Sequence, residues 1–328
     1  MRYIRKVLPF VLTGVLLVIV LLALSNLVTP KNNAQDAGHD AWAAYGFEAE
    51  PEDTIDVFII GDSESRTSIS PMKMFHDVGI TSYCCGVNAC NLSDEKQMLK
   101  RILKTQSPKL VILEANVIFT ELDWEYILFS DLSYLFPVLT WHDRWKHLTV
   151  DDFTKVPEST QIEARKGYYH AKVYNEAPTY LKDRYMREDD TIDPIPPANV
   201  HVFRQIAALC RKNGIDLLVL SAPSIRNWDM AKSNAVRQLV ADEEEAAAKA
   251  GTTVKYVDMN LMTDEIPIDW DKDTRDEGDH LNNSGMEKVC NWLGPWLKEN
   301  YGLKDHREDP ACRKTWTDLY DDYIKWIS

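Results

Sequence analysis

The sequence predicts an α/β fold of the flavodoxin-like type, a three-layer α/β/α arrangement around a five-stranded parallel sheet. Two observations predict it. Short, β-branched apolar runs alternate with amphipathic helical segments, which is typical of a parallel sheet covered by helices on both faces. The chain also has 328 residues, 45% of them hydrophobic and 27% charged, which is enough to bury a large core.

Five runs are the predicted strands, and they are short enough to be buried strands followed by sharp turns. They cover residues 55–60, 81–84, 110–113, 217–220 and 254–257. The first run ends at Gly61 and the second just before Gly86. These glycines predict tight turns at the ends of the two strands.

Helical spacing predicts the segments between the strands. Ser93 with Asp94 and Glu95 is typical of a helix start, and an apolar face then runs to Pro108. Further helices are predicted after residues 196–197, over residues 229–250, and from His280 onward, where His280 opens the final helix. Residues 117–193 interrupt this alternation and hold 14 of the 33 aromatic residues, so we interpret them as an aromatic-rich, partly helical insertion. An aromatic core that packs the insertion onto the sheet is favoured over a carbohydrate platform.

The N-terminus predicts a membrane anchor. Residues 7–30 form an uncharged stretch of 24 residues, long enough as a helix to cross a hydrocarbon core of about 30 Å. Arg2, Arg5 and Lys6 precede it, which by the positive-inside tendency leaves the N-terminus in the cytoplasm and the rest of this single-pass membrane protein outside the cell. The alternative is a cleaved signal peptide, because Ala23-Leu24-Ser25 offers small residues where a peptidase would cleave.

Four parts follow from these features. Residues 1–30 are the cytoplasmic stub and transmembrane anchor (or signal peptide), and residues 31–53 are a polar linker. Residues 54–300 are the α/β domain, interrupted by the insertion at 117–193. Residues 301–328 form a helical tail that we expect to pack on the domain, because its apolar residues recur at helical spacing.

Charge and cysteine content exclude several classes of function. The net charge is −14, from 37 basic and 51 acidic side chains, which argues against nucleic acid as a partner. The six cysteines contain no Cys-x-x-Cys pair, so neither a metal nor another cofactor is expected. Cys290 with Cys312, or Cys84 or Cys85 with Cys90, are candidate disulfides after export, and free buried thiols are the equal alternative.

Candidate catalytic groups follow four of the predicted strands. In a parallel sheet, the loops past the carboxyl ends of the strands meet at one edge. Ser63 follows the first strand within Gly61-Asp62-Ser63, Gly86 follows the second, and Asn116 follows the third. Ser63 is a candidate nucleophile, because a serine at a strand-to-helix turn exposes its hydroxyl and directs its own amide toward an incoming carbonyl.

His280 is the candidate general base. A serine hydroxyl needs a neighbouring base, and that base needs an acid to hold its tautomer. Glu277, three residues earlier, can accept the Nδ1 proton, but Asp276 and Asp279 flank it, so the sequence leaves open which acid orients His280.

These residues resemble the four sequence blocks of the SGNH/GDSL hydrolases, in family order, across nearly all of residues 54–300. The blocks are residues 61–63, Gly86, Asn116, and His280-Leu281-Asn282 with Gly285. The stretch 61–71 is especially similar to membrane-anchored cell-surface members related to the D-alanine transfer protein of teichoic acid modification. The sequence departs from the family in having Glu277 where an aspartate is usual. It also departs from the family in the residues that surround Gly86 in the second block and Asn116 in the third.

The resemblance implies a serine esterase or O-acyltransferase outside the cell. It implies Ser63 as nucleophile, His280 as base with Glu277 or Asp276 as its acid, and an oxyanion hole of Ser63, Gly86 and Asn116. The neighbouring Asp62, Asn88 and Glu114 are the expected substrate-binding residues. The expected substrate carries acetyl or alanyl esters on a cell-envelope polysaccharide or teichoic acid, and the expected partners are that polymer, the membrane and a membrane acyltransferase. The alternative is a non-catalytic surface protein of the same fold that binds glycan or that acyltransferase.

Overall fold

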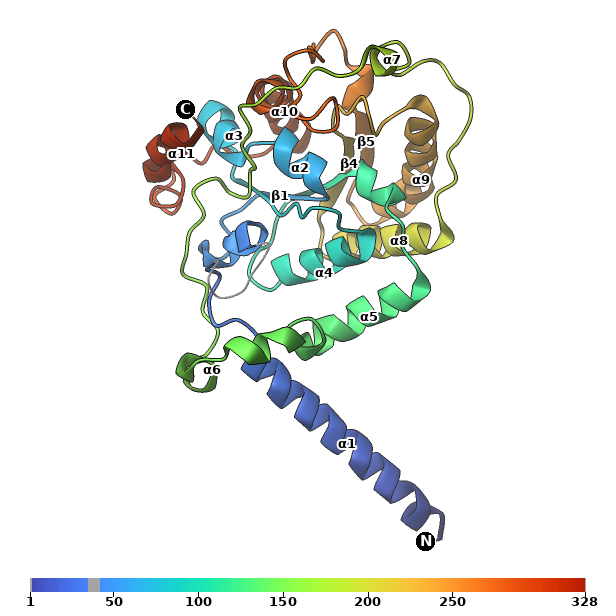
Figure 1. Ribbon diagram of the computed structural model, residues 1–328, viewed down its shortest axis with the longest axis vertical. Helices are drawn as coiled ribbons and strands as arrows, with labels where there is room; N and C mark the ends of the chain where they lie inside the picture. The colour runs from blue at the N-terminus through green and yellow to red at the C-terminus, as the bar shows by residue number, and fades with distance from the viewer. Residues whose placement is uncertain (1, 35–41, 328) are drawn as a thin grey trace. The chain divides into compact units, whose positions relative to one another are not determined.

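The computed structural model describes residues 2–34 and 42–327 (Figure 1). Residues 35–41, in the middle of the predicted linker, lie outside the described residues. The chain divides into two compact units. The first is made by the described residues within Met1–Trp42 together with Trp124–Gln161, and the second by Ala43–Asp123 and Ile162–Ser328.

The second unit is built on a five-stranded parallel sheet. Its strands are β1 (Val57–Ile60), β2 (Ser82–Cys84), β3 (Leu110–Glu114), β4 (Asp216–Ser221) and β5 (Val254–Asp258). They lie in the order β2-β1-β3-β4-β5, and every neighbouring pair is parallel. Every residue of the three strands β1, β2 and β3 is buried. The predicted class, a five-stranded parallel α/β sheet with helices on both sides, is confirmed, and the strand boundaries differ from the prediction by one or two residues.

Helices cover both faces of this sheet (Figure 1). One group packs together beside the first strands and consists of α2 (Ser63–Ser68), α3 (Pro71–Val78) and α10 (Asn283–Tyr301). The other group consists of α4 (Leu92–Ile102), α8 (Pro197–Lys212) and α9 (Met230–Lys249), of which α8 contacts both α4 and α9. Helices on both faces explain why the strands are apolar on both sides.

Local hydrogen bonds set where two of these helices begin. Asn91 caps α4 in a capping box with Asp94, so the helix begins at Leu92 and not at Ser93. Asn282 caps α10, whose first residue is Asn283. His280 therefore does not open the final helix: it lies before the cap, next to Leu281, which forms an isolated antiparallel bridge with Thr274. This correction matters for the site, because it places His280 on a tight loop.

The first unit contains the long N-terminal helix α1 (Arg2–Val28). Residues Lys6–Val28 of α1 are long and apolar enough to cross a membrane, and a signal sequence would pass the same test. The unit also contains α5 (Trp124–Leu135), η4 (Pro137–Leu139), η5 (His142–His147) and α6 (Val150–Thr154). The aromatic residues of the predicted insertion differ in burial. Tyr168, in the second unit, is buried, whereas Trp124, Phe129 and Trp145, in the first unit, are exposed.

Shorter elements complete the chain. They are η2 (Trp42–Ala49), η3 (Ala115–Phe119), α7 (Thr179–Lys182), η6 (Met259–Leu261), η7 (Thr317–Leu319) and α11 (Tyr320–Ile327). The tail that ends in η7 and α11 contacts the core of the second unit. Trp316 is fully buried against Phe75, with ring centroids 5.1 Å apart, and the Tyr323 hydroxyl lies 2.7 Å from Ser70 Oγ. All six cysteines are buried free thiols.

Candidate active site

Ser63 lies at the turn between β1 and α2. It is the first residue of α2, and Asp62 caps the helix by accepting a hydrogen bond from the Glu64 backbone N–H at 3.1 Å. Gly61 has φ +145°, and a Cβ placed there would lie 2.6 Å from Glu114 Cβ at the end of β3. The turn therefore needs glycine at position 61 for two reasons: its backbone conformation and the close approach of the neighbouring strand.

His280 connects Ser63 to an acid. Its Nε2 lies 2.7 Å from Ser63 Oγ, and its Nδ1 lies 2.7 Å from Asp276 Oδ2. Asp276 Oδ1 also accepts the His280 backbone N–H at 2.7 Å, so one carboxylate holds both the ring and the main chain of the histidine. Serine, histidine and aspartate are thus linked in the order that nucleophilic catalysis by a serine requires.

The three acids before His280 lie in different places. Asp276 contacts the ring directly, and the Asp279 Oδ2 lies 3.6 Å from the same Nδ1. Glu277 has φ +62°, is 61% exposed, and pairs with Arg226 at 3.0 Å. Of the acids that the sequence left open, Asp276 is therefore the one that orients His280 in this structure.

The electrostatics of Asp276 favour its ionised form. Burial by itself raises the pKa of this carboxyl. Hydrogen bonds from His280 and the nearby charges of His280 and Arg275 more than offset the burial, so the pKa of Asp276 is lowered. An ionised Asp276 can stabilise a positive charge on the imidazole of His280.

Three buried carboxyls lie around the turn that carries Ser63. Asp62, Glu64 and Glu114 are 5%, 3% and 1% exposed, and they can bring carboxylate oxygens within 4.8 Å of one another. Burial first, and then hydrogen bonding to Asp62, raises the pKa of Glu64 to about 9, and burial also raises the pKa of Glu114 well above its usual range. At neutral pH Glu64 therefore carries a proton, and both carboxyls act as hydrogen-bonded structural groups. Asp62 and Glu114, expected to bind substrate, form part of this cluster and do not line an open surface.

Asn116 and Gly86 lie at the same edge of the sheet as Ser63, and both make contacts within the protein. The Asn116 side-chain amide donates to Asp62 Oδ2 at 2.9 Å and to Glu64 Oε1 at 3.3 Å. Gly86 lies against the first turn of α2, since a Cβ there would lie 2.8 Å from the carbonyl oxygen of Asp62. The structure thus brings the three expected oxyanion-hole residues to one place, with the amide of Asn116 held by carboxyl groups.

Basic and aromatic side chains lie beside α2. The guanidinium of Arg66 lies 4.8 Å from the ring centroid of Tyr169, and that of Arg275 lies 4.9 Å from the same centroid. Asn88, an expected substrate-binding residue, accepts a hydrogen bond from Arg66 at 3.4 Å in an exposed position. Asn88 is thus the one expected substrate-binding residue that faces solvent.

Asn227 also belongs to the site, although it is not among the residues predicted from the sequence. Its side-chain amide donates to Glu64 Oε1 at 2.6 Å and to Asp279 Oδ1. It therefore ties the helix that carries Ser63 to the loop that carries His280. Asn227 lies six residues after the end of β4, and its signal in the sequence is the same as for Ser63, Gly86 and Asn116: a polar residue in the loop that follows a parallel strand.

Three groups of described residues could offer three metal-binding atoms within 4.8 Å of one another. Two belong to the site just described: Asp62 with Glu64 and Glu114, and Glu64 with Asp279 and His280. Their hydrogen bonds to asparagine, serine and each other account for their arrangement. The proton held by Glu64 must leave before its carboxyl binds a cation.

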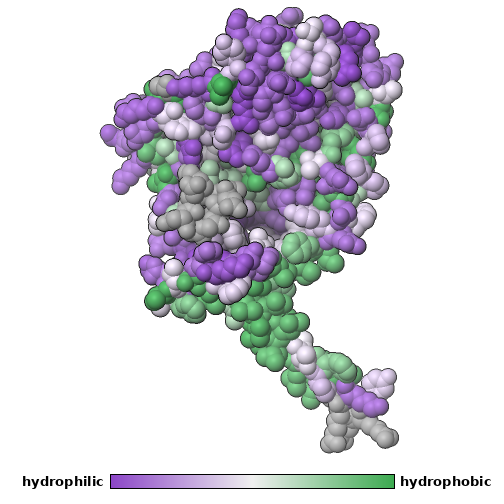
Figure 2. All heavy atoms as spheres, in the orientation of Figure 1, coloured by the Kyte–Doolittle hydropathy of each residue, from purple (hydrophilic) through white to green (hydrophobic). Residues whose placement is uncertain are grey.

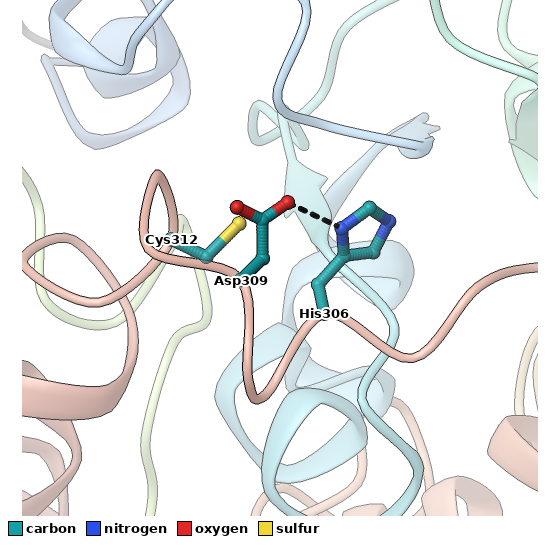
Figure 3. Close-up of side chains that lie close together, drawn as sticks. All are labelled: His306, Asp309 and Cys312. Carbon is teal, nitrogen blue, oxygen red and sulfur yellow. Dashed lines mark hydrogen bonds and ion pairs between the residues drawn. The ribbon is translucent and has the colours of Figure 1, made fainter.

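The third group is His306, Asp309 and Cys312 in the C-terminal tail (Figure 3). His306 contacts a carboxylate through each ring nitrogen: Nδ1 lies 3.4 Å from Asp309, and Nε2 lies 3.0 Å from Asp56. Burial raises the pKa of the Cys312 thiol to about 11, so this thiol is protonated at neutral pH. The contact with Asp56 attaches the tail to the residue before β1, at the end of the strand away from Ser63.

Comparisons with known proteins add a structural likeness. No family model and no curated protein matches the chain. Among solved structures, the chain is similar to the crystal structure of a putative acylhydrolase from Bacteroides fragilis NCTC 9343, at 12% sequence identity and a TM-score of 0.39. The match covers 80% of this chain and 97% of the other.

Proposed function

We propose that the protein is an SGNH-type serine esterase or O-acyltransferase that acts outside the cell on ester-linked acyl groups of an envelope polymer. The observation that carries this proposal is the chain of contacts Ser63–His280–Asp276, with 2.7 Å at each step. The resemblance of residues 61–63, Gly86, Asn116 and His280 to the family's blocks supports the same chemistry.

In the proposed mechanism, Ser63 Oγ attacks the ester carbonyl while His280 Nε2 takes the hydroxyl proton. Asp276 stays ionised and stabilises the imidazolium. The tetrahedral oxyanion accepts hydrogen bonds from the backbone N–H groups of Ser63 and Gly86 and from the Asn116 amide, which must first release one of its carboxyl partners. His280 then donates the proton to the leaving alcohol, which yields the acyl-enzyme. Water or a second hydroxyl attacks the acyl-enzyme, with His280 again as base.

We propose further that α1 remains as a membrane anchor. The end of α1 is bonded to the rest of the first unit: Ser25 Oγ accepts from the Val138 backbone N–H at 3.1 Å, and the carbonyl oxygen of Val28 accepts from Arg144 at 3.1 Å. Cleavage after residues 23–25 would remove Ser25 together with most of α1 and would abolish the contact between Ser25 and Val138. An anchor holds the site near envelope polymers such as an acylated polysaccharide or a teichoic acid, and near a membrane acyltransferase.

The test of the enzyme proposal is covalent labelling of the purified full chain with a fluorophosphonate. We expect one label on Ser63, which is lost in Ser63→Ala and falls strongly in His280→Ala. Ser65→Ala, a change of another serine in the same helix, is the matched control and should still be labelled. Intact mass measured after incubation with acetyl or alanyl ester donors then identifies the acyl group.

A correctly folded chain that takes no label and forms no acyl-enzyme would contradict the enzyme proposal. That result would favour the alternative of a surface protein that binds glycan or a membrane acyltransferase without catalysis. Circular dichroism of each variant separates loss of the nucleophile from loss of the fold.

A further inference from the structure

The first unit exposes an apolar surface next to the end of α1. We propose that residues 124–156, which we call the collar, lie in the outer interface of the lipid bilayer around the end of α1. This inference rests on the proposal that α1 spans the membrane. It assigns lipid as a binding partner of the collar, in addition to the contact that the collar makes with α1.

Helix α5 carries a continuous apolar stripe. Trp124, Leu128, Leu132 and Leu135 follow one another at helical spacing and are 57%, 61%, 38% and 59% exposed. Phe129 beside them is 47% exposed, whereas α5 buries only Ile127 and Ser130. A helix with such an apolar stripe normally turns it toward a protein core or a membrane surface.

The rest of the collar extends this surface. Its exposed apolar side chains are Trp145, Val150, Phe153 and Val156, which are 63% to 83% exposed. In Figure 2 the green, apolar surface of α1 continues onto the adjoining part of the same unit. An exposed apolar surface of this kind marks a site of interaction, because leaving it in water is unfavourable.

The contacts of α1 fix the depth of the collar. Residues Lys6–Val28 form a helix of 23 residues, about 34 Å at 1.5 Å per residue, so its end reaches just past a hydrocarbon core of about 30 Å. Ser25 and Val28 in this last turn bond to Val138 and Arg144 of the collar. The collar therefore begins at the level where hydrocarbon gives way to headgroups.

The chemistry of the collar fits that level. Tryptophan and tyrosine favour the membrane interface, where an apolar ring and a polar N–H or O–H are both solvated, and α5 contains one exposed residue of each type. The charged pairs Lys146–Asp143 and Lys155–Asp151 provide headgroup-compatible groups between the apolar residues. Continuity with α1 favours lipid over another protein, because the same bilayer already surrounds the helix to which the collar is bonded.

The test is spin labelling of the full chain in nanodiscs of equimolar phosphatidylcholine and phosphatidylglycerol. Labels are placed on Leu128→Cys and Leu135→Cys in the collar, on Leu16→Cys in α1, and on Leu261→Cys. Leu261 is the matched control, because it is an exposed leucine, 45% exposed, in the second unit. All six native cysteines are buried, so the unmodified chain measures background labelling.

We expect the labels at positions 128 and 135 to gain relaxation by oxygen, which dissolves in lipid, and to lose relaxation by a water-soluble nickel chelate, both relative to position 261. Nickel relaxation at 128 and 135 equal to that at 261, with position 16 protected, would overturn the collar proposal and leave the anchor intact. Nickel relaxation at position 16 as well would overturn both. Protection of 128 and 135 from both reagents would show that protein covers the collar, and would overturn lipid as its partner.

Discussion

At the residue scale, backbone conformation decides which acid serves His280. Glu277 stands at the position that the family resemblance favours, but its φ of +62° belongs to a turn that directs its side chain to Arg226. Asp276, one residue earlier, reaches both the ring and the backbone N–H of His280. A spacing of three or four residues from a histidine cannot settle such a choice, because it depends on the turn between them.

This assignment makes a paired prediction. Asp276→Asn should lower kcat by up to about 10⁴-fold, because an amide no longer stabilises the imidazolium or fixes its tautomer. Glu277→Gln should stay close to wild type, since it removes only an exposed ion pair. The measurement is the rate of ester hydrolysis or of fluorophosphonate labelling for each variant. The reverse ranking of the two variants would assign the acid to Glu277.

The protonated carboxyl Glu64 makes a prediction about pH. Its pKa is about 9 in the folded chain against an ordinary value of 4.5, so the folded state holds a proton that the unfolded state releases between these values. The contribution of Glu64 to the free energy of unfolding is thus complete below about pH 4.5. It declines as the pH rises toward 9, by at most about 1.4 kcal/mol per pH unit.

Glu64→Gln imitates the protonated side chain and should remove this decline. We expect the variant to gain stability over wild type as the pH rises from 5 to 8, as measured by urea unfolding at each pH. Glu245→Gln, a change of an exposed glutamate on α9, is the control and should leave the pH dependence unchanged. Parallel pH curves for wild type and Glu64→Gln would show that Glu64 is ionised in the folded state.

At the scale of elements, the turn between β1 and α2 depends on the contact between two strands. Gly61 combines φ +145° with a space closed by Glu114 of β3. A sequence pattern of strand followed by glycine predicts the turn, but the closeness of β3 is a property of the assembled sheet.

Gly61→Ala should therefore be costly. The backbone conformation alone is expected to cost about 1–3 kcal/mol of folding free energy, and the contact with Glu114 adds to it and displaces Ser63. Gly251→Ala is the matched control, because Gly251 has φ +76° but a Cβ placed there would have no neighbouring atom within 4 Å. For this variant we expect a loss of about 1–2 kcal/mol in the free energy of unfolding and normal labelling of Ser63. Urea unfolding and fluorophosphonate labelling measure the two effects, and equal losses in both variants would contradict the contact with β3.

At the scale of the whole molecule, the C-terminal tail contributes to the core of the second unit. Trp316 is fully buried between Phe75 and Lys166, whose Nζ lies 4.9 Å from the indole centroid. The side chains of Lys166 and Glu50 are both 0% exposed and are paired beside it. The tail therefore packs over a buried ion pair of the second unit.

Trp316→Ala should lower the free energy of unfolding by about 3–5 kcal/mol, because it leaves a large cavity over this pair. Tyr174→Ala is the control, since Tyr174 is a 66% exposed aromatic residue of the second unit, and it should change the free energy of unfolding by about 0.5 kcal/mol or less. Urea unfolding in detergent micelles measures both. Equal stability of the two variants would mean that the tail is not required for the fold.

The sequence by itself determined the class of the fold and the residues that gather at one edge of its sheet. Apolar runs of four to six residues, separated by amphipathic helices, are typical of a parallel sheet covered on both faces. Ser63, Gly86 and Asn116 each follow such a run, which places them at one edge of the sheet. Such patterns are local, because strand and helix periodicity are written in neighbouring residues.

Only the tertiary structure decided which side chains meet. The contact between Ser63 and His280, the choice of Asp276, the bridge made by Asn227 and the neutral state of Glu64 all depend on groups distant in sequence. The exposure of the aromatic residues of α5 belongs here too, since the same composition would suit a buried core. Hydrogen-bond geometry and desolvation act between groups brought together by folding, so no local pattern encodes them.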